Sequence, residues 1–364
     1  MHVPDGFINA PVSVAAAVVA AGAVTLSLRG ARRELAGAAH GTAGADRTAP
    51  LAGLVAAFIF AVQMLNFPVA AGTSGHLLGG ALAAILVGPY TGVLCVSVVL
   101  LMQGILFADG GLTALGVNIT VMGVVTVVVA YATFRGLLKV LPATRRSVTV
   151  AAFAGALLSV PAAAVAFTGL YAIGGTTDVS VGKVLTAMVG VHTLIGIGEA
   201  AITAATVGAV IAVRPDLVHG ARGLTTPLKL RVAGELVDAP AAAPVPAAAR
   251  STRAVWATGL VTALLLAGFV SFYASASPDG LEKVAADQGI DAKVEDHAAK
   301  DSPLADYGIK DVADARLSGG LAGMIGVGAT VAVGSGVFWA VRRRTAAAVN
   351  AAETAPAAVA GEAR

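Results

Sequence analysis

Long apolar stretches constrain this chain more than any other feature of its sequence. The chain runs repeatedly for about 17 or more residues without a charged side chain, and a helix needs roughly 20 mostly apolar residues to cross the ~30 Å hydrocarbon core of a bilayer. Over the whole sequence 57% of residues are hydrophobic, 12% are charged, and the mean hydropathy is +0.83. These values exclude a soluble fold and predict an all-α polytopic membrane protein.

Nine of these stretches are candidate membrane spans. The third is short, and the Gly- and Ser-rich residues around its start predict irregular backbone there. We expect seven spans to form one bundle and two to form a C-terminal module. The stretches cover residues 10–28, 51–67, 76–88, 91–107, 112–134, 148–172, 184–213, 254–274 and 318–341.

The basic residues predict the orientation of these spans. If Met1 lies outside, the cytoplasmic connections and the C-terminal tail contain 18 of the 24 Lys and Arg residues, as the positive-inside rule requires. Merging the third and fourth stretches into one helix kinked at Pro89 would move two basic loops to the wrong side. We therefore expect nine crossings of a bacterial cell (inner) membrane, with the N-terminus outside and the C-terminus in the cytoplasm. The first span has no basic residues before it, so we expect it to be retained rather than cleaved as a signal peptide.

A Pro- and Ala-rich segment divides the chain into two modules. We expect a seven-span domain over 1–222, a cytoplasmic linker over 223–252 and a two-span domain over 253–344. The extracytoplasmic loop of the second domain, 275–317, has ten acidic and five basic residues. This excess of negative charge either attracts cations to the membrane or belongs to an ordinary solvated loop. The Ala-rich tail 345–364 is expected to be disordered.

The chain opens with MHVPDGF, which can form a metal chelate. A free amino group at Met1, the deprotonated amide nitrogen of His2 and the His2 imidazole supply three nitrogens close to one plane. Because His2 is bulky, we expect Met1 to be kept. Tetragonal nitrogen sites favour nickel(II) or copper(II), and imidazole suits nickel, zinc and similar ions.

A fourth donor is expected from a histidine on the outer side or within the membrane. The predicted topology assigns His40 and His219 to the cytoplasmic side and His297 to the acidic loop. His76 and His192 remain, and His76 is favoured because it lies in the Gly- and Ser-rich segment that opens the short third span. The alternative is that His2 is accidental and His76 is an ordinary loop residue.

Several other polar residues lie within or near the spans. His192 and Glu199 are seven residues apart and share one helix face. Ionisable residues in a span are costly and usually functional or enclosed by other helices, so we expect these two to support the site, pack in the bundle or contact a partner rather than bind metal directly. Four amides either line a metal cavity or form hydrogen bonds between helices. These are Gln63, Asn66, Gln103 and Asn118.

Several kinds of chemistry have no support in the sequence. It lacks a P-loop motif, an H-E-x-x-H zinc motif and a recognisable nucleophilic triad, so ATP hydrolysis or proteolysis by the chain itself is not expected. One cysteine, Cys95, excludes an intrachain disulfide and a site built from several cysteines. Glu199 with His192 leaves a proton relay in a secondary transporter open, although paired broken helices in two halves are absent.

Four motifs carry a resemblance that spans nearly the whole chain. They are MHVPDGF at 1–7, NFPVAAGTSGHLLGGALAAILVGPY at 66–90, FADGGLTALGVNI at 107–119 and GVHTLIGIGEA at 190–200. With them the sequence resembles the CbiM/NikM substrate-binding membrane component of energy-coupling factor transporters for cobalt or nickel. SPDGLEKVA at 277–285 and SPLADYGI at 302–309 resemble the PDGLE domain, a relative of the small CbiN/NikN component.

The resemblance implies a metal ion held by the Met1 amine, the His2 amide and imidazole, and the His76 imidazole. It also implies a transmembrane coupling subunit of the CbiQ/NikQ type and cytoplasmic ATPases of the CbiO/NikO type, which agrees with the missing P-loop. Such a component captures Ni²⁺ or Co²⁺ outside the cell as a substrate, and no cofactor is expected. Nickel and cobalt stay undecided because both accept the same nitrogen donors.

Two rival functions remain at this point. The first is an ion-coupled secondary transporter of transition metals that works without an ATPase. The second is a membrane enzyme or assembly factor whose acidic loop binds a partner. Membrane lipid surrounds the chain in each case, and nothing in the sequence indicates nucleic acid binding.

Overall fold

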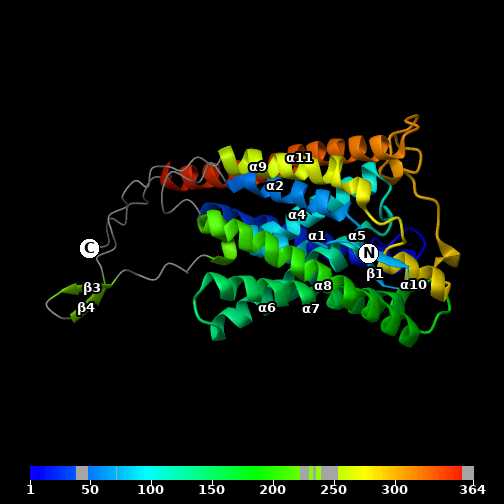
Figure 1. Cartoon of the computed structure of the whole chain (residues 1–364), viewed down its shortest axis with the longest axis horizontal. Coiled ribbons are helices and arrows are strands. Elements are labelled where there is room, and N and C mark those ends of the chain that lie inside the picture. The colour runs from blue at the N-terminus through cyan, green and yellow to red at the C-terminus, as the bar shows by residue number, and fades with distance from the viewer. Residues whose placement is uncertain (38–47, 71, 222–228, 233–234, 239–252, 355–364) are drawn as a thin grey trace, which may run out of the picture.

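The computed structural model describes residues 1–37, 48–70, 72–221, 229–232, 235–238 and 253–354 (Figure 1). Within these residues, seven helices are long and apolar enough to cross a membrane, which confirms the all-α polytopic fold. They are α1 (Ala10–Gly37), α4 (Pro89–Leu106), the continuous run of α5 (Leu115–Asn118), η2 (Ile119–Val125) and α6 (Thr126–Val140), α7 (Arg145–Gly174), α8 (Val181–Val213), α9 (Arg253–Gly268) together with η5 (Val270–Tyr273), and α11 (Ala315–Thr354).

Two further helices are shorter. α2 (Thr48–Gln63) is apolar throughout, and α3 (Gly80–Val87) has eight residues. At 1.5 Å per residue α3 is about 12 Å long, too short to cross a bilayer on its own. The expected third span at 76–88 is therefore wrong as a continuous helix: its first residues are extended, and a two-stranded hairpin precedes them.

The hairpin consists of β1 (Phe67–Ala70) and β2 (Thr73–Gly75), which pair antiparallel. The glycines of this segment explain why a helix does not form, since Gly72 and Gly79 both take positive φ. α3 is almost entirely buried, packing against α4, α6, α7 and α8, so the irregular backbone is enclosed by protein rather than exposed to lipid.

The chain turns between α3 and α4, which are separate helices as expected, while the number of crossings stays a prediction. Gly88 takes a φ of 103° between the two helices, and Pro89 occupies the first turn of α4, where its missing N–H costs nothing. The two helices pack against each other, so Pro89 begins a new helix rather than kinking an existing one.

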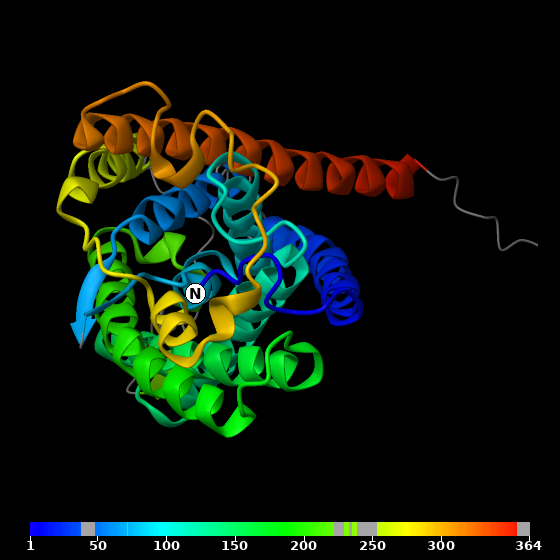
Figure 2. The same cartoon turned by 90° about the vertical axis from the view of Figure 1, so that its right-hand side faces the viewer.

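The second module lies along the first (Figure 1). α11 and α9 pack on α2 and on each other. The segment between α9 and α11 includes α10 (Gly280–Gln288), and it extends across the end of the bundle where the N-terminus lies. Viewed along the bundle, the N-terminus is near the centre, with α10 beside it (Figure 2).

Two expectations outside the bundle have different outcomes. The linker prolines at 239–249, and His40, lie outside the described residues, whereas β3 (Lys229–Val232) and β4 (Glu235–Asp238) form a small antiparallel hairpin within the expected linker. The tail expected to be disordered from residue 345 is helical up to Thr354, as part of α11. Its alanine-rich sequence explains this, because alanine has the highest helix propensity.

Close packing of α11 on the first module depends on a small residue. A Cβ atom at Gly326 would overlap the ring of the buried Phe60 and lie 2.8 Å from Phe107. Two residues further along the same helix, a Cβ at Gly328 would meet nothing within 4 Å among the described residues.

We therefore predict that Gly326→Ala lowers the thermal unfolding midpoint of the full chain in detergent. Overpacking of this kind costs about 1–3 kcal/mol. The matched variant Gly328→Ala should leave the midpoint unchanged or raise it, because alanine is favoured over glycine in a helix by up to about 1 kcal/mol. Equal midpoints for the two variants would contradict the described contact between α11 and α2.

Candidate metal site

The N-terminal segment is held inside the bundle by the connection between α4 and α5 and by α5 itself. Met1 is 2% exposed and Val3 is fully buried. The side chain of Asn118 accepts the Val3 N–H at 2.8 Å and donates to the Val3 carbonyl at 3.1 Å. The Asp5 carboxylate accepts hydrogen bonds from the N–H and hydroxyl of Thr113, at 2.8 and 2.5 Å. These bonds fix the peptide immediately after His2, so Asn118 supports the site by positioning backbone.

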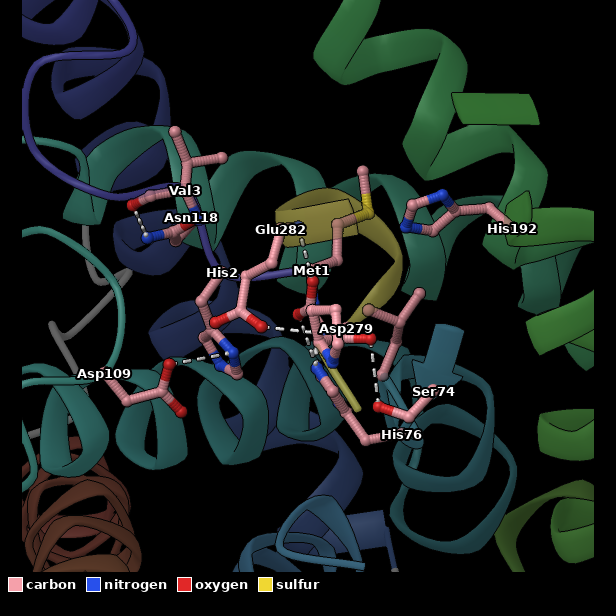
Figure 3. Close-up of polar contacts among 12 residues, drawn as sticks. Met1, His2, Val3, Ser74, His76, Asp109, Asn118, His192, Asp279 and Glu282 are labelled. Atoms are coloured by element: carbon pink, nitrogen blue, oxygen red, sulfur yellow. Dashed lines mark hydrogen bonds and ion pairs between the residues drawn. The ribbon is translucent and has the colours of Figure 1, made fainter. Parts of the chain in front are cut away.

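The α-amino group of Met1 lies beside His76, as Figure 3 shows. Its nitrogen is 2.8 Å from His76 Nε2. His76 Nδ1 lies 3.0 Å from the carbonyl oxygen of Leu77, which can only accept, so the proton belongs on Nδ1 and Nε2 is left with a lone pair. Two nitrogens that bind one ion at about 2.0–2.1 Å and at right angles would be about 2.9 Å apart. The amine and His76 are therefore already spaced like adjacent metal ligands.

His2, another predicted ligand, lies beside His76. Its ring stacks on the His76 ring with centroids 5.1 Å apart and planes 19° from parallel. Its Nδ1 is 3.2 Å from Asp109 Oδ1, and its Nε2 is 3.1 Å from Gln103 Oε1. Burial lowers the pKa of His2 to about 4, although the Asp109 carboxylate opposes this shift. At neutral pH the imidazole is thus in the neutral form that binds metal ions.

Asp109 in turn contacts the second module. The hydroxyl of Tyr307 donates to Asp109 Oδ2 at 2.6 Å, and burial raises the pKa of Tyr307 well above its usual range, which keeps the hydroxyl protonated. Tyr307 also stacks on Phe107, the residue that follows α4. The orientation of His2 therefore depends on residues from both modules.

The extended backbone after His76 is held by two polar side chains from different helices. The Glu199 carboxylate, from α8, accepts the N–H groups of Leu78 at 2.7 Å and Gly79 at 3.2 Å. Gln63, from α2, donates to the Leu78 carbonyl at 2.9 Å. Backbone that lacks helical partners inside a bundle must be satisfied by side chains. Glu199 and Gln63 therefore position His76 rather than contact it.

The other two predicted residues, His192 and Asn66, make no hydrogen bond to Met1, His2 or His76 among the described contacts. His192 is buried in α8, and its Nδ1 lies 2.8 Å from the Met188 carbonyl, while its Nε2 has no hydrogen-bond partner among the described residues. It lies on the other side of Met1 from His2 in the close-up (Figure 3). Asn66 contributes its backbone carbonyl, which accepts the N–H of Ser275.

A carboxylate that sequence reasoning did not assign to the site lies at its centre. Asp279 Oδ2 is 2.6 Å from the Met1 nitrogen and 3.6 Å from His76 Nε2 (Figure 3). With His2 and His76 it forms a group whose potential ligand atoms all lie within 4.8 Å of one another. Burial raises the pKa of Asp279, but the amine and His76 outweigh it and hold the value well below the usual range. The carboxyl is therefore ionised.

The sequence contained a partial signal for Asp279. It precedes α10 as an N-cap in a capping box: its Oδ1 accepts the N–H of Glu282 at 2.9 Å, and Glu282 accepts the N–H of Asp279 at 2.9 Å. The order Asp-Gly-Leu-Glu after a proline indicates such a helix start. It does not indicate which distant residues the cap will meet.

Comparison with known proteins agrees with this architecture. Residues 2–217 match the family model CbiM, described as the cobalt uptake substrate-specific transmembrane region, and residues 253–343 match the PDGLE domain. A putative metal transport protein of Haloquadratum walsbyi is 40% identical over 220 residues, covering 60% of this chain and 93% of that protein. A putative fused nickel transport protein, NikMN, of Archaeoglobus fulgidus is 38% identical over 221 residues, covering 60% of this chain and 68% of that protein.

A solved structure is also similar. The crystal structure of a transition metal transporter aligns with a TM-score of 0.50 and 25% identity, covering 58% of this chain and 93% of that one. The family match covers more than half of the chain and the second match covers its C-terminal module. The chain belongs to the CbiM family, and its CbiM region is joined to a C-terminal PDGLE domain.

Proposed function

We propose that this chain is the substrate-binding component of a nickel or cobalt uptake system, and that Met1, His2 and His76 bind the metal ion. The observation that carries the proposal is the 2.8 Å separation of the Met1 nitrogen and His76 Nε2, beside the stacked ring of His2. The donors are the Met1 amine, the amide and imidazole nitrogens of His2, and the His76 imidazole. The ion is the substrate and not a resident cofactor.

The donor set suits both metals. Four nitrogens, one of them a deprotonated amide, favour Ni²⁺ in a square arrangement, and imidazole-rich sites also accept ions such as Co²⁺. Relatives of this chain include proteins named for nickel transport and proteins named for cobalt transport. We therefore propose a site for either ion and leave the choice to the metal content of the purified protein.

Burial of the site argues for transport by a change of conformation. Met1 is 2% exposed and His76 is 6% exposed, so an ion bound between them would be enclosed on both sides. The site lies toward the end of the bundle opposite the β3–β4 hairpin and the end of α11 (Figure 1). With that end outside the cell, the chain would load from outside and release the ion inward after its helices or its N-terminal segment move.

We propose that separate subunits drive this change. The chain has no P-loop, and its family membership supports a coupling subunit of the CbiQ/NikQ type with ATPases of the CbiO/NikO type. The energy-coupling factor arrangement assigns capture to this chain and ATP hydrolysis to its partners. The rival secondary transporter would need no partner.

The metal site is tested by extending the N-terminus. We expect the full chain with Met1 as its first residue, verified by intact mass, to retain close to one Ni²⁺ or Co²⁺ per chain after purification. One glycine placed before Met1 moves the amine and should abolish retention while leaving every side chain in place. His76→Ala should have the same effect.

A control for this experiment is His219→Ala. His219 contacts Tyr131 and lies beyond α8, away from the proposed site, so its loss should leave metal content unchanged. Equal metal in the native, extended and His76→Ala proteins would overturn the proposed ligand set. Absence of bound metal from the native protein would favour the enzyme or assembly factor.

Glu199 should matter for metal binding through the backbone that it holds. Glutamine at this position can accept through one oxygen only, so one of the two N–H groups of Leu78 and Gly79 loses its acceptor. We predict that Glu199→Gln raises hydrogen exchange at residues 78–79 and weakens Ni²⁺ binding by about 10-fold, as the loss of a supporting residue does in metal sites.

The matched variant is Thr203→Val, one turn further along α8. The Thr203 hydroxyl is buried and has no hydrogen-bond partner among the described residues. Its removal should change neither the exchange rate nor the affinity. Unaltered exchange at 78–79 in Glu199→Gln would show that the carboxylate does not hold this segment.

The partner requirement is tested by uptake in cells. We expect nickel or cobalt uptake when the chain is coexpressed with a coupling subunit and ATPases, and its loss when the P-loop lysine of those ATPases is replaced. The matched control is the chain alone at the same expression level, which should give no uptake. Uptake by the chain alone that a protonophore abolishes would instead establish the secondary transporter.

A further inference from the structure

The segment between α9 and α11 supplies the site with its closest anion. We infer that the second module completes the metal site of the first, with the carboxylate of Asp279 acting as the counter-ion of the bound divalent cation. This inference rests on the proposed function and adds to it a residue from the other module. It assigns Asp279 a role in affinity, next to the nitrogen donors that contact the ion.

A charge balance shows why the site needs an anion. With a divalent ion, one deprotonated amide, a neutral amine and two neutral imidazoles, the loaded site has a net charge of +1. A buried charge without a partner is costly, and it is stabilised only by a well-placed opposite charge. Asp279 is the carboxylate that contacts the Met1 nitrogen, at 2.6 Å, and its side chain is 11% exposed.

Asp279 Oδ2 lies 2.6 Å from the Met1 nitrogen, which is itself a proposed ligand atom. An ion bound to that nitrogen would therefore have the carboxylate as a close neighbour, and the negative charge of Asp279 would oppose the +1 of the loaded site. Asp109 does not replace Asp279 in this role, because its contacts are with His2 Nδ1 and the Tyr307 hydroxyl and its side chain is 26% exposed.

Asp279 is held in position by its own helix cap and by the residues before it. Its Oδ1 is used by the capping box of α10, which leaves Oδ2 directed at the amine. Ser74 fastens the preceding residues, since its N–H donates to the Pro278 carbonyl at 2.8 Å and its hydroxyl donates to the Ser277 carbonyl at 2.7 Å. Ser74 is two residues before His76, so one short strand positions both a metal ligand and the counter-ion.

Gly280 allows this approach. A Cβ atom there would lie 2.7 Å from Ile195 and 3.1 Å from His192, so a larger residue would push the start of α10 away from α8. Because the carboxylate is fixed before any ion arrives, little conformational entropy is lost on loading. The order Ser-Pro-Asp-Gly-Leu-Glu thus has a physical explanation. The Ser-Pro carbonyls accept hydrogen bonds from Ser74, Asp279 is the counter-ion, Gly280 allows the close approach to α8, and Glu282 completes the cap.

The test compares two neutralising substitutions in the full chain. Asp279→Asn keeps the size of the side chain and an oxygen for the cap, because asparagine is a good N-cap residue. Asp291→Asn removes the same charge from the same loop at an exposed position. Affinity for Ni²⁺ is measured by titration calorimetry in detergent, at one pH and salt concentration.

We expect Asp279→Asn to weaken Ni²⁺ binding by about 10- to 100-fold, the range found when partners of metal ligands are removed, and Asp291→Asn to bind like the native chain. Asp279→Ser, a second neutral residue that can cap α10, should weaken binding to a similar degree, so a folding defect in one variant does not decide the result. The thermal unfolding midpoint of each variant reports on folding.

The outcomes separate this inference from the proposed function. Native or tighter affinity in both Asp279→Asn and Asp279→Ser overturns the counter-ion role, as does an equal loss in Asp291→Asn, which would assign the effect to the charge of the whole loop. If His76→Ala also binds like the native chain, the ligand set itself is wrong. Loss of binding in His76→Ala with native affinity in Asp279→Asn overturns this inference alone.

Discussion

The buried α-amino group of Met1 is the constraint on which the rest of this structure depends. An ammonium in the interior of a helical bundle needs an opposite charge and hydrogen-bond acceptors, since burial without them is strongly unfavourable. Here it contacts Asp279 and His76, from the two modules. A chain terminus can be placed at this depth only if the backbone around it is irregular and its polar groups are satisfied by side chains.

That requirement explains the irregular segment found where the third span was expected. A complete helix at 76–88 would use its own backbone hydrogen bonds and would not need side chains to satisfy them. The chain instead forms a hairpin, an extended stretch and the short helix α3. The side chains of Glu199 and Gln63 bond backbone groups that have no helical partner. The polar residues within the spans are therefore explained mainly by backbone positioning, with direct contact to the ion left to the N-terminus and His76.

Hydropathy predicted the long apolar helices well, because an apolar run of sufficient length has few alternatives in a bilayer. The chelate at Met1 and His2 was also accessible from sequence, since its geometry is set by covalent bonds between neighbouring residues. His76 was reached by eliminating other histidines, and the structure brings it to the amine. Its role as a ligand stays a prediction. The hairpin at 67–75 was missed because an apolar segment with glycines fits both a helix start and extended backbone.

Asp279 could not be predicted because its contact with Met1 joins residues 278 positions apart. A capping pattern identifies where α10 begins, but the docking of that helix depends on Ser74, on the space beside Gly280 and on the path of the whole loop. The acidic composition of 275–317 allowed two readings, diffuse attraction of cations or simple solvation, and the structure adds a third. One carboxylate of the loop contacts the Met1 nitrogen, and the others do not need to share its role.

The proposed role of Asp279 gives the fusion of the two modules a physical explanation. If Asp279 is the counter-ion of the loaded site, this carboxylate, 2.6 Å from the Met1 nitrogen, can stay where it is when the ion binds. The second module supplies this anion from the N-cap of α10, and its Tyr307 hydroxyl donates to Asp109. Under this inference the module favours the loaded state without occupying a coordination position. Covalent linkage keeps that anion at high effective concentration beside the site.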